Sequence, residues 1–198
     1  EQTPNLKIVE ATAAEIITKG KKVRAVRCSD GKIYSAPTVI LTTGTFLSGL
    51  MHIGTEQFAG GRLGEPAANE LSKSLCQIGL KLERLKTGTP ARLDAATIDL
   101  DKLEVQMGDE KPVPFSFMNE RITRPQVPCW ITYTNEKIHN LIRKNLRYAP
   151  LYSGQITSTG PRYCPSIETK ILRFADKKRH QVFLEPEDEE QSTIYCNG

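Results

Sequence analysis

The 198-residue sequence carries 27 lysine and arginine residues against 23 aspartate and glutamate residues, a formal net charge of +4, and 38% of it is hydrophobic. No run of about 18 apolar residues occurs, and the polar opening residues lack the apolar core of a signal peptide, so neither a transmembrane helix nor a leader is expected. The small positive charge is by itself weak support for a nucleic-acid partner.

The first elements predicted along the chain are strands. Residues 6–17 open with a strand-like apolar run, and residues 23–28 alternate with the period of two of a half-buried strand. Asp30-Gly31 is a strong hairpin signal, and residues 33–35 follow as the partner strand.

Residues 39–41 form a continuous apolar run, typical of a buried strand in a parallel sheet. The run ends at Thr43 and Gly44, small residues that let a ligand approach the backbone. In doubly wound sheets, ligands lie beyond the carboxyl ends of strands, and a hairpin before such a strand is found in glutathione-reductase-type flavoproteins. A plain strand end is the alternative interpretation.

A glycine-rich loop and a helix are expected next. Residues 49–64 hold five glycines without the G-x-G-x-x-G spacing of a dinucleotide site, so a functional loop is predicted. Residues 66–80 predict a helix with Leu71, Leu75 and Ile78 on its core-facing stripe. Residues 86–90 then form either an anion-binding turn or an ordinary turn.

The second half predicts a mixture of turns, strands and helices. Residues 91–124 are rich in turn residues, and residues 130–134 read as a strand by composition. Asn135 is expected to cap a helix that reaches about residue 148. The lysines and arginines of this helix are expected to face solvent. Four apolar residues share its predicted inward face: Ile138, Leu141, Ile142 and Leu146.

Residues 154–165 form a predicted loop, and a helix is expected over 167–175. Its predicted inward residues are Ile167, Ile171, Leu172 and Phe174. A strand follows at 181–184, and residues 194–198 begin another element. The clustered basic residues between 162 and 179 leave a solvated surface and a nucleic-acid partner both open, whereas the acidic run 185–190 is interpreted as solvated surface.

Cys164 is the candidate reactive group. It lies just before Ser166, the expected N-cap of the helix at 167–175, and Arg162 is close in sequence. A helix N-terminus and a nearby cation both favour the thiolate, which can act as a nucleophile or acid/base group. A packed loop thiol is the alternative.

Other kinds of site find no support in the sequence. The five cysteines are odd in number and irregularly spaced, so a disulfide framework or zinc site is not expected and a reducing compartment fits best. The three histidines lack metal-ligand spacing, so no metal site is predicted. No G-x-S-x-G element or Walker A motif occurs.

Eight blocks along the chain form an ordered series that covers nearly its whole length: residues 43–47, 52–54, 60–62, 84–92, 115–117, 128–136, 160–168 and 180–186. In sequence and in order, these blocks resemble the MnmG/GidA family of tRNA-modifying flavoenzymes. The resemblance implies that the chain is an internal fragment of such an enzyme.

The implied fold class is α/β, part of a Rossmann-like FAD-binding domain of the glutathione-reductase type with an inserted mixed α/β domain. Residues 1–87 would belong to the FAD-binding domain and residues 88–186 to the insertion, which would face NAD and tRNA. Residues 187–198 would return toward the FAD-binding domain.

The implied activity is modification of the tRNA wobble uridine at carbon 5, by carboxymethylaminomethyl addition. The resemblance implies FAD, NADH and methylene-tetrahydrofolate as cofactors or carbon donor, and tRNA as substrate. It also implies a homodimer that joins the GTPase MnmE in a heterotetramer, without membrane attachment. The bacterial cytoplasm is the expected location, with the mitochondrial matrix as alternative, and the fragment alone is expected to be inactive.

The resemblance also assigns individual residues. Cys164 matches the family's essential cysteine, a covalent or proton-transfer partner for the uracil ring. FAD contacts are implied at Ala13, Thr43, Gly44 and Ala68. The implied NAD segment consists of Gly160, Pro161, Arg162, Tyr163, Cys164, Pro165, Ser166, Ile167, Glu168, Thr169, Lys170, Ile171, Leu172, Arg173 and Phe174.

Three departures from the family pattern stand out. Ala68 occupies a position where many relatives have serine, which removes a side-chain hydrogen bond to FAD. Trp130 replaces the common tyrosine, and the acidic residues 187–190 replace a glycine-rich turn.

Two other functions remain open from the sequence. One is a glutathione-reductase-type flavoprotein oxidoreductase without an RNA substrate. The other is a non-catalytic module that binds RNA or a partner protein. The block at residues 160–168 favours the tRNA-modifying enzyme over the first of these.

Overall fold

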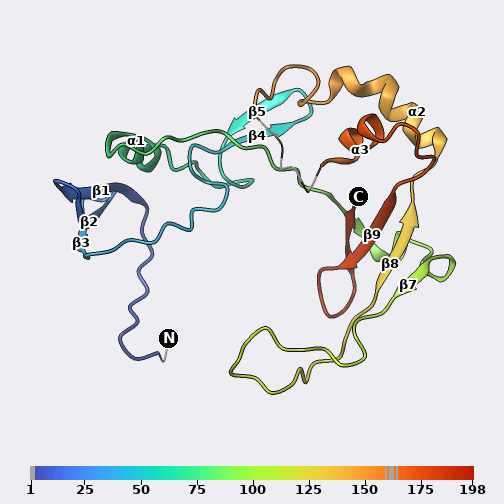
Figure 1. Ribbon diagram of the computed structural model, residues 1–198, viewed down its shortest axis with the longest axis horizontal. Helices are drawn as coiled ribbons and strands as arrows, with labels where there is room; N and C mark the ends of the chain where they lie inside the picture. Colours follow the sequence, from blue (N-terminus) through green and yellow to red (C-terminus); the bar gives the residue numbers. More distant parts are fainter. Residues whose placement is uncertain (1–2, 159, 161–162, 164) are drawn as a thin grey trace. The chain divides into compact units, whose positions relative to one another are not determined.

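The computed structural model describes residues 3–158, 160, 163 and 165–198, and the chain divides into two compact units, Glu1–Arg84 and Leu85–Gly198. Figure 1 shows the elements of each unit. No described helix is both long enough and apolar enough to cross a membrane.

The first unit contains a three-stranded antiparallel sheet of β1 (Ala13–Lys19), β2 (Lys22–Cys28) and β3 (Ile33–Ser35). The strands predicted at 23–28 and 33–35 are confirmed, and so is the turn between them. The backbone N–H of Lys32 donates to Asp30 Oδ1 at 3.0 Å, and Gly31 has a φ of 85° that favours glycine. The first strand begins at Ala13, so the prediction of strand structure from residue 6 was wrong.

Helix α1 (Asn69–Gln77) packs on β1 and forms the core of the first unit. Leu71, Leu75 and Ile16 are nearly fully buried in one hydrophobic cluster. The helix is shorter than the predicted 66–80. Gly79 adopts a φ of 97°, which is incompatible with a continuing helix, and the cap residue Ile78 before it is 40% exposed. The core positions of the two leucines are confirmed, and that of Ile78 was wrong.

A buried hydroxyl joins α1 to β1. Ser74 Oγ accepts the backbone N–H of Ile16 at 2.9 Å, and both residues are at least 95% buried. We expect Ser74→Ala to destabilise this packing by about 1–3 kcal/mol, because the buried N–H of Ile16 loses its partner. Hydrogen exchange of the peptide 13–19 measures the loss. The exposed Ser35→Ala serves as control, and equal protection in both variants would contradict the expectation.

The predicted buried strand at residues 39–41 is wrong. The structure assigns no strand there, and Ile40 is 89% exposed. A strand needs a neighbour for its backbone hydrogen bonds. All strand pairs among the described residues are antiparallel. The parallel pairing in that part of the chain is a single isolated bridge between Leu47 and Ala68. The segment therefore has no parallel strand beside it in the part of the chain that the structure describes.

The glycine-rich stretch 49–64 was predicted as a loop but contains a hairpin of β4 (Leu50–Ile53) and β5 (Glu56–Ala59). Gly54 makes its turn with a φ of 59°. Gly61 lies directly against Phe46, where a Cβ atom would collide with the aromatic ring. In this stretch, Gly54 therefore permits a tight turn, and Gly61 permits the backbone to lie directly against the ring of Phe46.

The second unit is built on a five-stranded antiparallel sheet. In spatial order its strands are β6 (Ala91–Asp94), β10 (Thr193–Asn197), β9 (Gln181–Pro186), β8 (Cys129–Tyr133) and β7 (Glu104–Gln106). The strands predicted near 130–134 and 181–184 are confirmed, and the element expected to begin near residue 194 is the strand β10. The other two, β6 and β7, were missed because they are short and lie among turn residues. Trp130, Leu184 and Ile194 form the centre of the core.

Helices α2 (Glu136–Asn145) and α3 (Ile167–Arg173) contact each other beside this sheet (Figure 1). The predicted cap is confirmed, since Asn135 Oδ1 accepts the backbone N–H of Ile138 at 3.0 Å. A further helical turn, Leu146–Tyr148, extends α2 to the predicted end.

The predicted inward faces of the two helices were only partly confirmed, since Ile142, Leu146 and Ile167 are partly buried but other predicted residues are exposed. In α2, Ile138 and Leu141 are 39% and 62% exposed, whereas His139 is 1% exposed. In α3, Ile171 is fully buried as predicted, but Leu172 and the following Phe174 are exposed. Apolar periodicity identified these helices without identifying which side packs against the sheet.

The acidic run between β9 and β10 is a structured turn. Asp188 accepts the backbone N–H groups of Ser192 at 2.7 Å and Thr193 at 3.0 Å. These hydrogen bonds hold the pKa of Asp188 below its ordinary value. Glu187 also pairs with Arg92 of β6 at 2.6 Å, so solvated surface is an incomplete description of this run.

Candidate functional site

The first candidate region is a loop cluster in the first unit. Ala68, which precedes α1, donates its N–H to the carbonyl of Phe46 at 2.8 Å and accepts the N–H of Ser48 at 3.3 Å. Phe46 in turn donates its N–H to the carbonyl of Thr43 at 3.1 Å. These bonds bring three of the four residues proposed to contact FAD, Thr43, Gly44 and Ala68, into one backbone-linked cluster.

A ligand at this cluster would meet backbone atoms rather than charged side chains. Gly44 is exposed and has a φ of 54°, a conformation that keeps this turn open to a close approach. Ala13 packs against the same hydrophobic cluster as Leu47, which adjoins this turn. These residues fit a group held through backbone contacts and small side chains.

Ala68 has no hydroxyl, and neighbouring serines do not replace one. Ser72 Oγ donates to the carbonyl of Ala68 at 3.2 Å and bonds Ser48 Oγ at 2.8 Å. Both serine hydroxyls therefore act within the loop cluster, where the backbone N–H and carbonyl of Ala68 are also engaged.

The second candidate region is the segment 160–174 at α3. Cys164, Pro161 and Arg162 lie outside the described residues. Ser166 is the N-cap residue by position, but its hydroxyl bonds Thr169 Oγ1 at 3.1 Å instead of a backbone N–H. Thr169 also bonds the hydroxyl of Tyr152 at 3.0 Å.

Side chains of this segment differ in what they could offer a ligand. Tyr163 is 88% exposed, and Pro165 to Lys170 are partly buried. Ile171 is fully buried, so its side chain serves the core rather than a bound molecule. Leu172, Arg173 and Phe174 are exposed.

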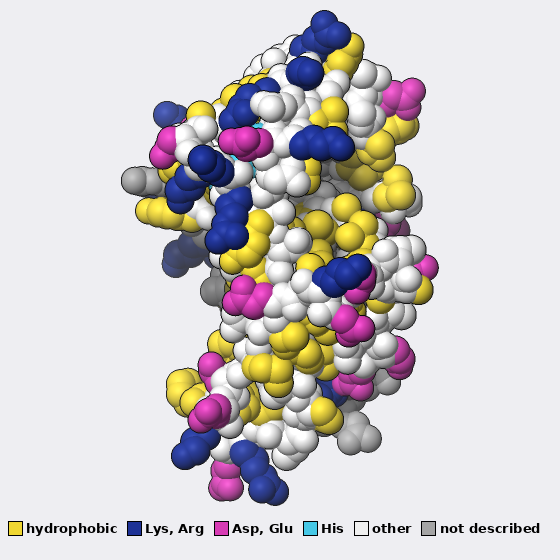
Figure 2. Space-filling view, turned by 90° about the vertical axis from the view of Figure 1, so that its right-hand side faces the viewer, with side chains coloured by type: hydrophobic (Ala, Val, Ile, Leu, Met, Phe, Trp, Pro, Cys, Tyr) yellow, Lys and Arg dark blue, Asp and Glu magenta, His cyan; other side chains and the backbone are white. Residues whose placement is uncertain are grey.

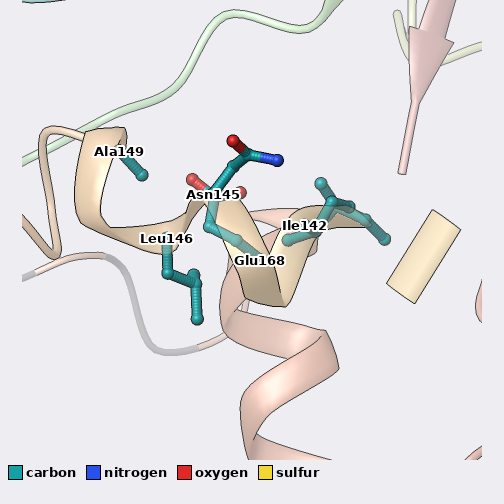
Figure 3. Close-up of a pocket in the computed structure, with 6 residues that line it drawn as sticks. Ile142, Asn145, Leu146, Ala149 and Glu168 are labelled. Atoms are coloured by element: carbon teal, nitrogen blue, oxygen red, sulfur yellow. The ribbon is translucent and has the colours of Figure 1, made fainter. Parts of the chain in front are cut away.

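A hollow of about 220 Å³ lies between α2 and α3 (Figure 3). Six residues line it: Ile142, Asn145, Leu146, Ala149, Ile167 and Glu168. Ligand pockets for drug-sized molecules commonly measure about 300–1,000 Å³. The hollow is therefore too small for a whole dinucleotide, although two of its lining residues belong to the proposed NAD segment.

A buried polar network was missed by the sequence reasoning. Thr134 Oγ1 lies 2.7 Å from His139 Nε2 and accepts the backbone N–H of His180 at 2.8 Å. The two imidazole rings are 5.2 Å apart, and both histidines are more than 90% buried. Spacing in sequence gave no signal, because 41 positions separate the histidines.

Burial of His180 predicts a pH-dependent stability. Burial first, and then His139, Lys170 and Lys177, lower the pKa of His180 below 6.5. The unfolded state binds the proton more readily than the folded state does. The neutral imidazole therefore contributes fully to the free energy of unfolding above pH 6.5, and this contribution is lost as pH falls from 6.5 toward the lowered pKa. We expect hydrogen-exchange protection of β8 and β9 to fall in that window, after correction for intrinsic rates. His180→Asn should flatten the dependence, and an unchanged profile in that variant would contradict the assignment.

The described residues contain no group of three or more His, Cys, Asp or Glu side chains placed to hold a metal ion. The free cysteines among them are Cys28, Cys76, Cys129 and Cys196. Burial raises the pKa of the Cys129 and Cys196 thiols, which disfavours their reactive thiolate form.

Comparisons with known proteins agree across the whole chain. The family model "Glucose inhibited division protein A" matches residues 1–198. A curated protein of Thermodesulfovibrio yellowstonii, named tRNA uridine 5-carboxymethylaminomethyl modification enzyme MnmG, is 54% identical over 100% of this chain and 32% of its own length. The protein of the same name from Rhodopirellula baltica is 51% identical over 100% of the chain and 32% of its own length. The chain thus spans about a third of these relatives.

Solved structures give the same result. The structure of Aquifex aeolicus GidA in its form I crystal is 48% identical, with a TM-score of 0.86 over 99% of this chain and 34% of that chain. Its form II crystal gives 46% identity and a TM-score of 0.80 over 94% of this chain and 30% of that chain. This likeness confirms the predicted fold class, a glutathione-reductase-type FAD-binding fold with mixed helices and sheets. The chain belongs to the GidA family.

Proposed function

We propose that the full-length protein containing this chain is an FAD- and NADH-dependent enzyme that modifies the wobble uridine of tRNA at carbon 5. The observation that carries this proposal is the identity of 50–54% to eight curated bacterial proteins, each named as a tRNA uridine 5-carboxymethylaminomethyl modification enzyme. Identity at this level over 99–100% of the chain supports a shared chemistry.

The proposal extends to partners, carbon donor and location. Methylene-tetrahydrofolate would supply the carbon, and the GTPase MnmE would join a homodimer of the protein in a heterotetramer. A bacterial cytoplasmic location is consistent with the bacterial sources of the relatives, and the mitochondrial matrix is the alternative.

The structural units receive roles under this proposal. Residues 1–87 would be part of the FAD-binding domain, 88–186 the insertion facing NAD and tRNA, and 187–198 the return toward the FAD-binding domain. FAD, when bound, supplies redox chemistry. Thr43, Gly44, Ala13 and Ala68 would contact it through backbone and small side chains.

The segment 160–174 would bind NAD and place Cys164 at the uracil ring. Arg173, which is exposed, would make such contacts. Cys164 would act there as nucleophile or proton-transfer group.

The test uses the full-length protein with MnmE, GTP, FAD, NADH, folate donor, glycine and unmodified tRNA. The tRNA is digested and the wobble nucleoside is read by mass spectrometry. A mass gain that requires each component supports the proposal. Bound FAD without a mass gain would favour a flavoprotein oxidoreductase that lacks an RNA substrate, and tRNA binding without flavin or product would favour a non-catalytic binding module.

A further inference from the structure

Positive charge in this chain is concentrated on two segments of the second unit. Residues 133–148 carry four basic and one acidic side chain, and residues 166–180 carry five basic and two acidic ones. These 31 residues therefore have a net charge of +6, while the other 167 have a net charge of −2. We call this region, which includes α2, α3 and the flanking turns, the basic face.

The cations of the basic face are not neutralised by neighbouring carboxylates. Six ion pairs join lysines or arginines to acidic residues elsewhere in the described chain. None of the nine basic residues of the face pairs with an acidic side chain among the described residues: Lys137, Arg143, Lys144, Arg147, Lys170, Arg173, Lys177, Lys178 and Arg179. Eight of the nine are exposed, all except Lys170.

The arrangement in space agrees with the sequence count. Figure 2 shows lysine and arginine side chains gathered over the upper part of the face, where α2 and α3 lie. On α2, Lys137 and Lys144 are seven residues apart and therefore project from the same side of the helix. Two of these cations, Lys170 and Lys177, both lie close enough to His180 to lower its pKa.

Aromatic rings are interleaved with these cations. The guanidinium of Arg179 lies 4.1 Å from the ring centroid of Tyr133, and that of Arg147 lies 4.8 Å from the ring of Tyr148. Lys177 Nζ lies 5.4 Å from the ring of Phe174. The three rings are 37%, 56% and 45% exposed, so each presents a flat apolar surface beside a positive charge.

We propose that the basic face binds the phosphate backbone of an RNA strand and stacks unpaired bases on its exposed rings. Unpaired cations meet phosphates, and aromatic side chains stack on bases in single-stranded loops. An acidic protein surface would use the charges but has less need of the rings, so RNA fits the combination better. The proposal deepens the proposed function, on which it rests for tRNA as the RNA concerned.

The first test measures affinity of the full-length protein for an unmodified tRNA transcript by fluorescence anisotropy, over a range of salt concentrations. Lys144→Glu/Lys178→Glu removes one exposed cation from each segment. We expect its affinity to fall about 10-fold or more near 0.1 M salt, and the slope of log affinity against log salt to decrease by about 2.

The matched control is Lys21→Glu/Lys22→Glu, which makes the same charge change at exposed positions of the first unit. It should keep the wild-type salt slope. Equal affinity and slope in the two double variants would overturn the proposal. Absence of tRNA binding by the wild type would also overturn it and leave an acidic protein as the partner of this face.

A second variant tests stacking. Tyr148→Ala should weaken tRNA binding about 5-fold or more, and Tyr148→Phe should restore it because the ring remains. Equal affinity of the two variants would remove the stacking part of the proposal. Failure of the nucleoside assay with tRNA binding intact would defeat the proposed enzyme activity and leave the basic face as an RNA-binding surface.

Discussion

Cys164→Ser is expected to lower wobble-uridine modification by about 10²-fold or more, since nucleophilic or acid/base groups commonly contribute about 10²–10⁴ in rate. Serine keeps the size of the side chain, but its hydroxyl is a far weaker nucleophile and acid than a thiol. The measurement is the rate of product formation, read by mass spectrometry of the wobble nucleoside in the reconstituted reaction.

The matched control is Cys76→Ser, an exposed free cysteine in α1 outside the proposed catalytic segment. It should retain wild-type activity. The Cys164 variant should bind tRNA within a few-fold of wild type, because the thiol is assigned to chemistry rather than affinity. Normal turnover of the Cys164 variant would exclude a catalytic role, and a large loss of affinity with normal chemistry would favour a binding role.

Thr134→Val is expected to destabilise the second unit by about 2–6 kcal/mol. The hydroxyl of Thr134 contacts His139 Nε2 at 2.7 Å and accepts the N–H of His180 at 2.8 Å, and all three residues are more than 90% buried. Valine has nearly the same shape but cannot hydrogen bond. Two buried polar groups are thereby left unpaired, each at a cost of about 1–3 kcal/mol.

Hydrogen exchange of the peptides that span β8 and β9 measures this effect. Both strands end or begin at the network, since Tyr133 precedes Thr134 and Gln181 follows His180. Thr123→Val, at an exposed position in the loop before β8, is the control and should change stability by no more than about 0.5 kcal/mol. Protection in Thr134→Val equal to that control would show that the network contributes little.

Local signals in the sequence were sufficient for several elements. Asp30-Gly31 predicted the hairpin, and Asn135 predicted the start of α2, because a turn and an N-cap depend on residues only two or three positions apart. Family blocks along the chain predicted the fold class and the family, which the comparisons confirm. The assignments of Cys164, the FAD contacts and the NAD segment stay predictions from the same blocks.

Burial was the property that the sequence could not determine. Residues 39–41 have the composition of a buried strand, yet Ile40 is 89% exposed because no parallel strand lies beside it in the described chain. In α2, apolar spacing pointed to Ile138 and Leu141, but the fold buries His139, whose partners Thr134 and His180 come from the ends of two strands.

The sequence by itself determined the family, the hairpin turn at Asp30-Gly31, the cap at Asn135 and the sign of the charge. Only the tertiary structure decided which helix side is buried, that two distant histidines share one network, and that the cations of α2 and α3 form one unpaired basic face beside aromatic rings. The physical reason is range: turns and caps are set by neighbours along the chain, whereas burial and electrostatic partners are set by residues that folding brings together from distant positions.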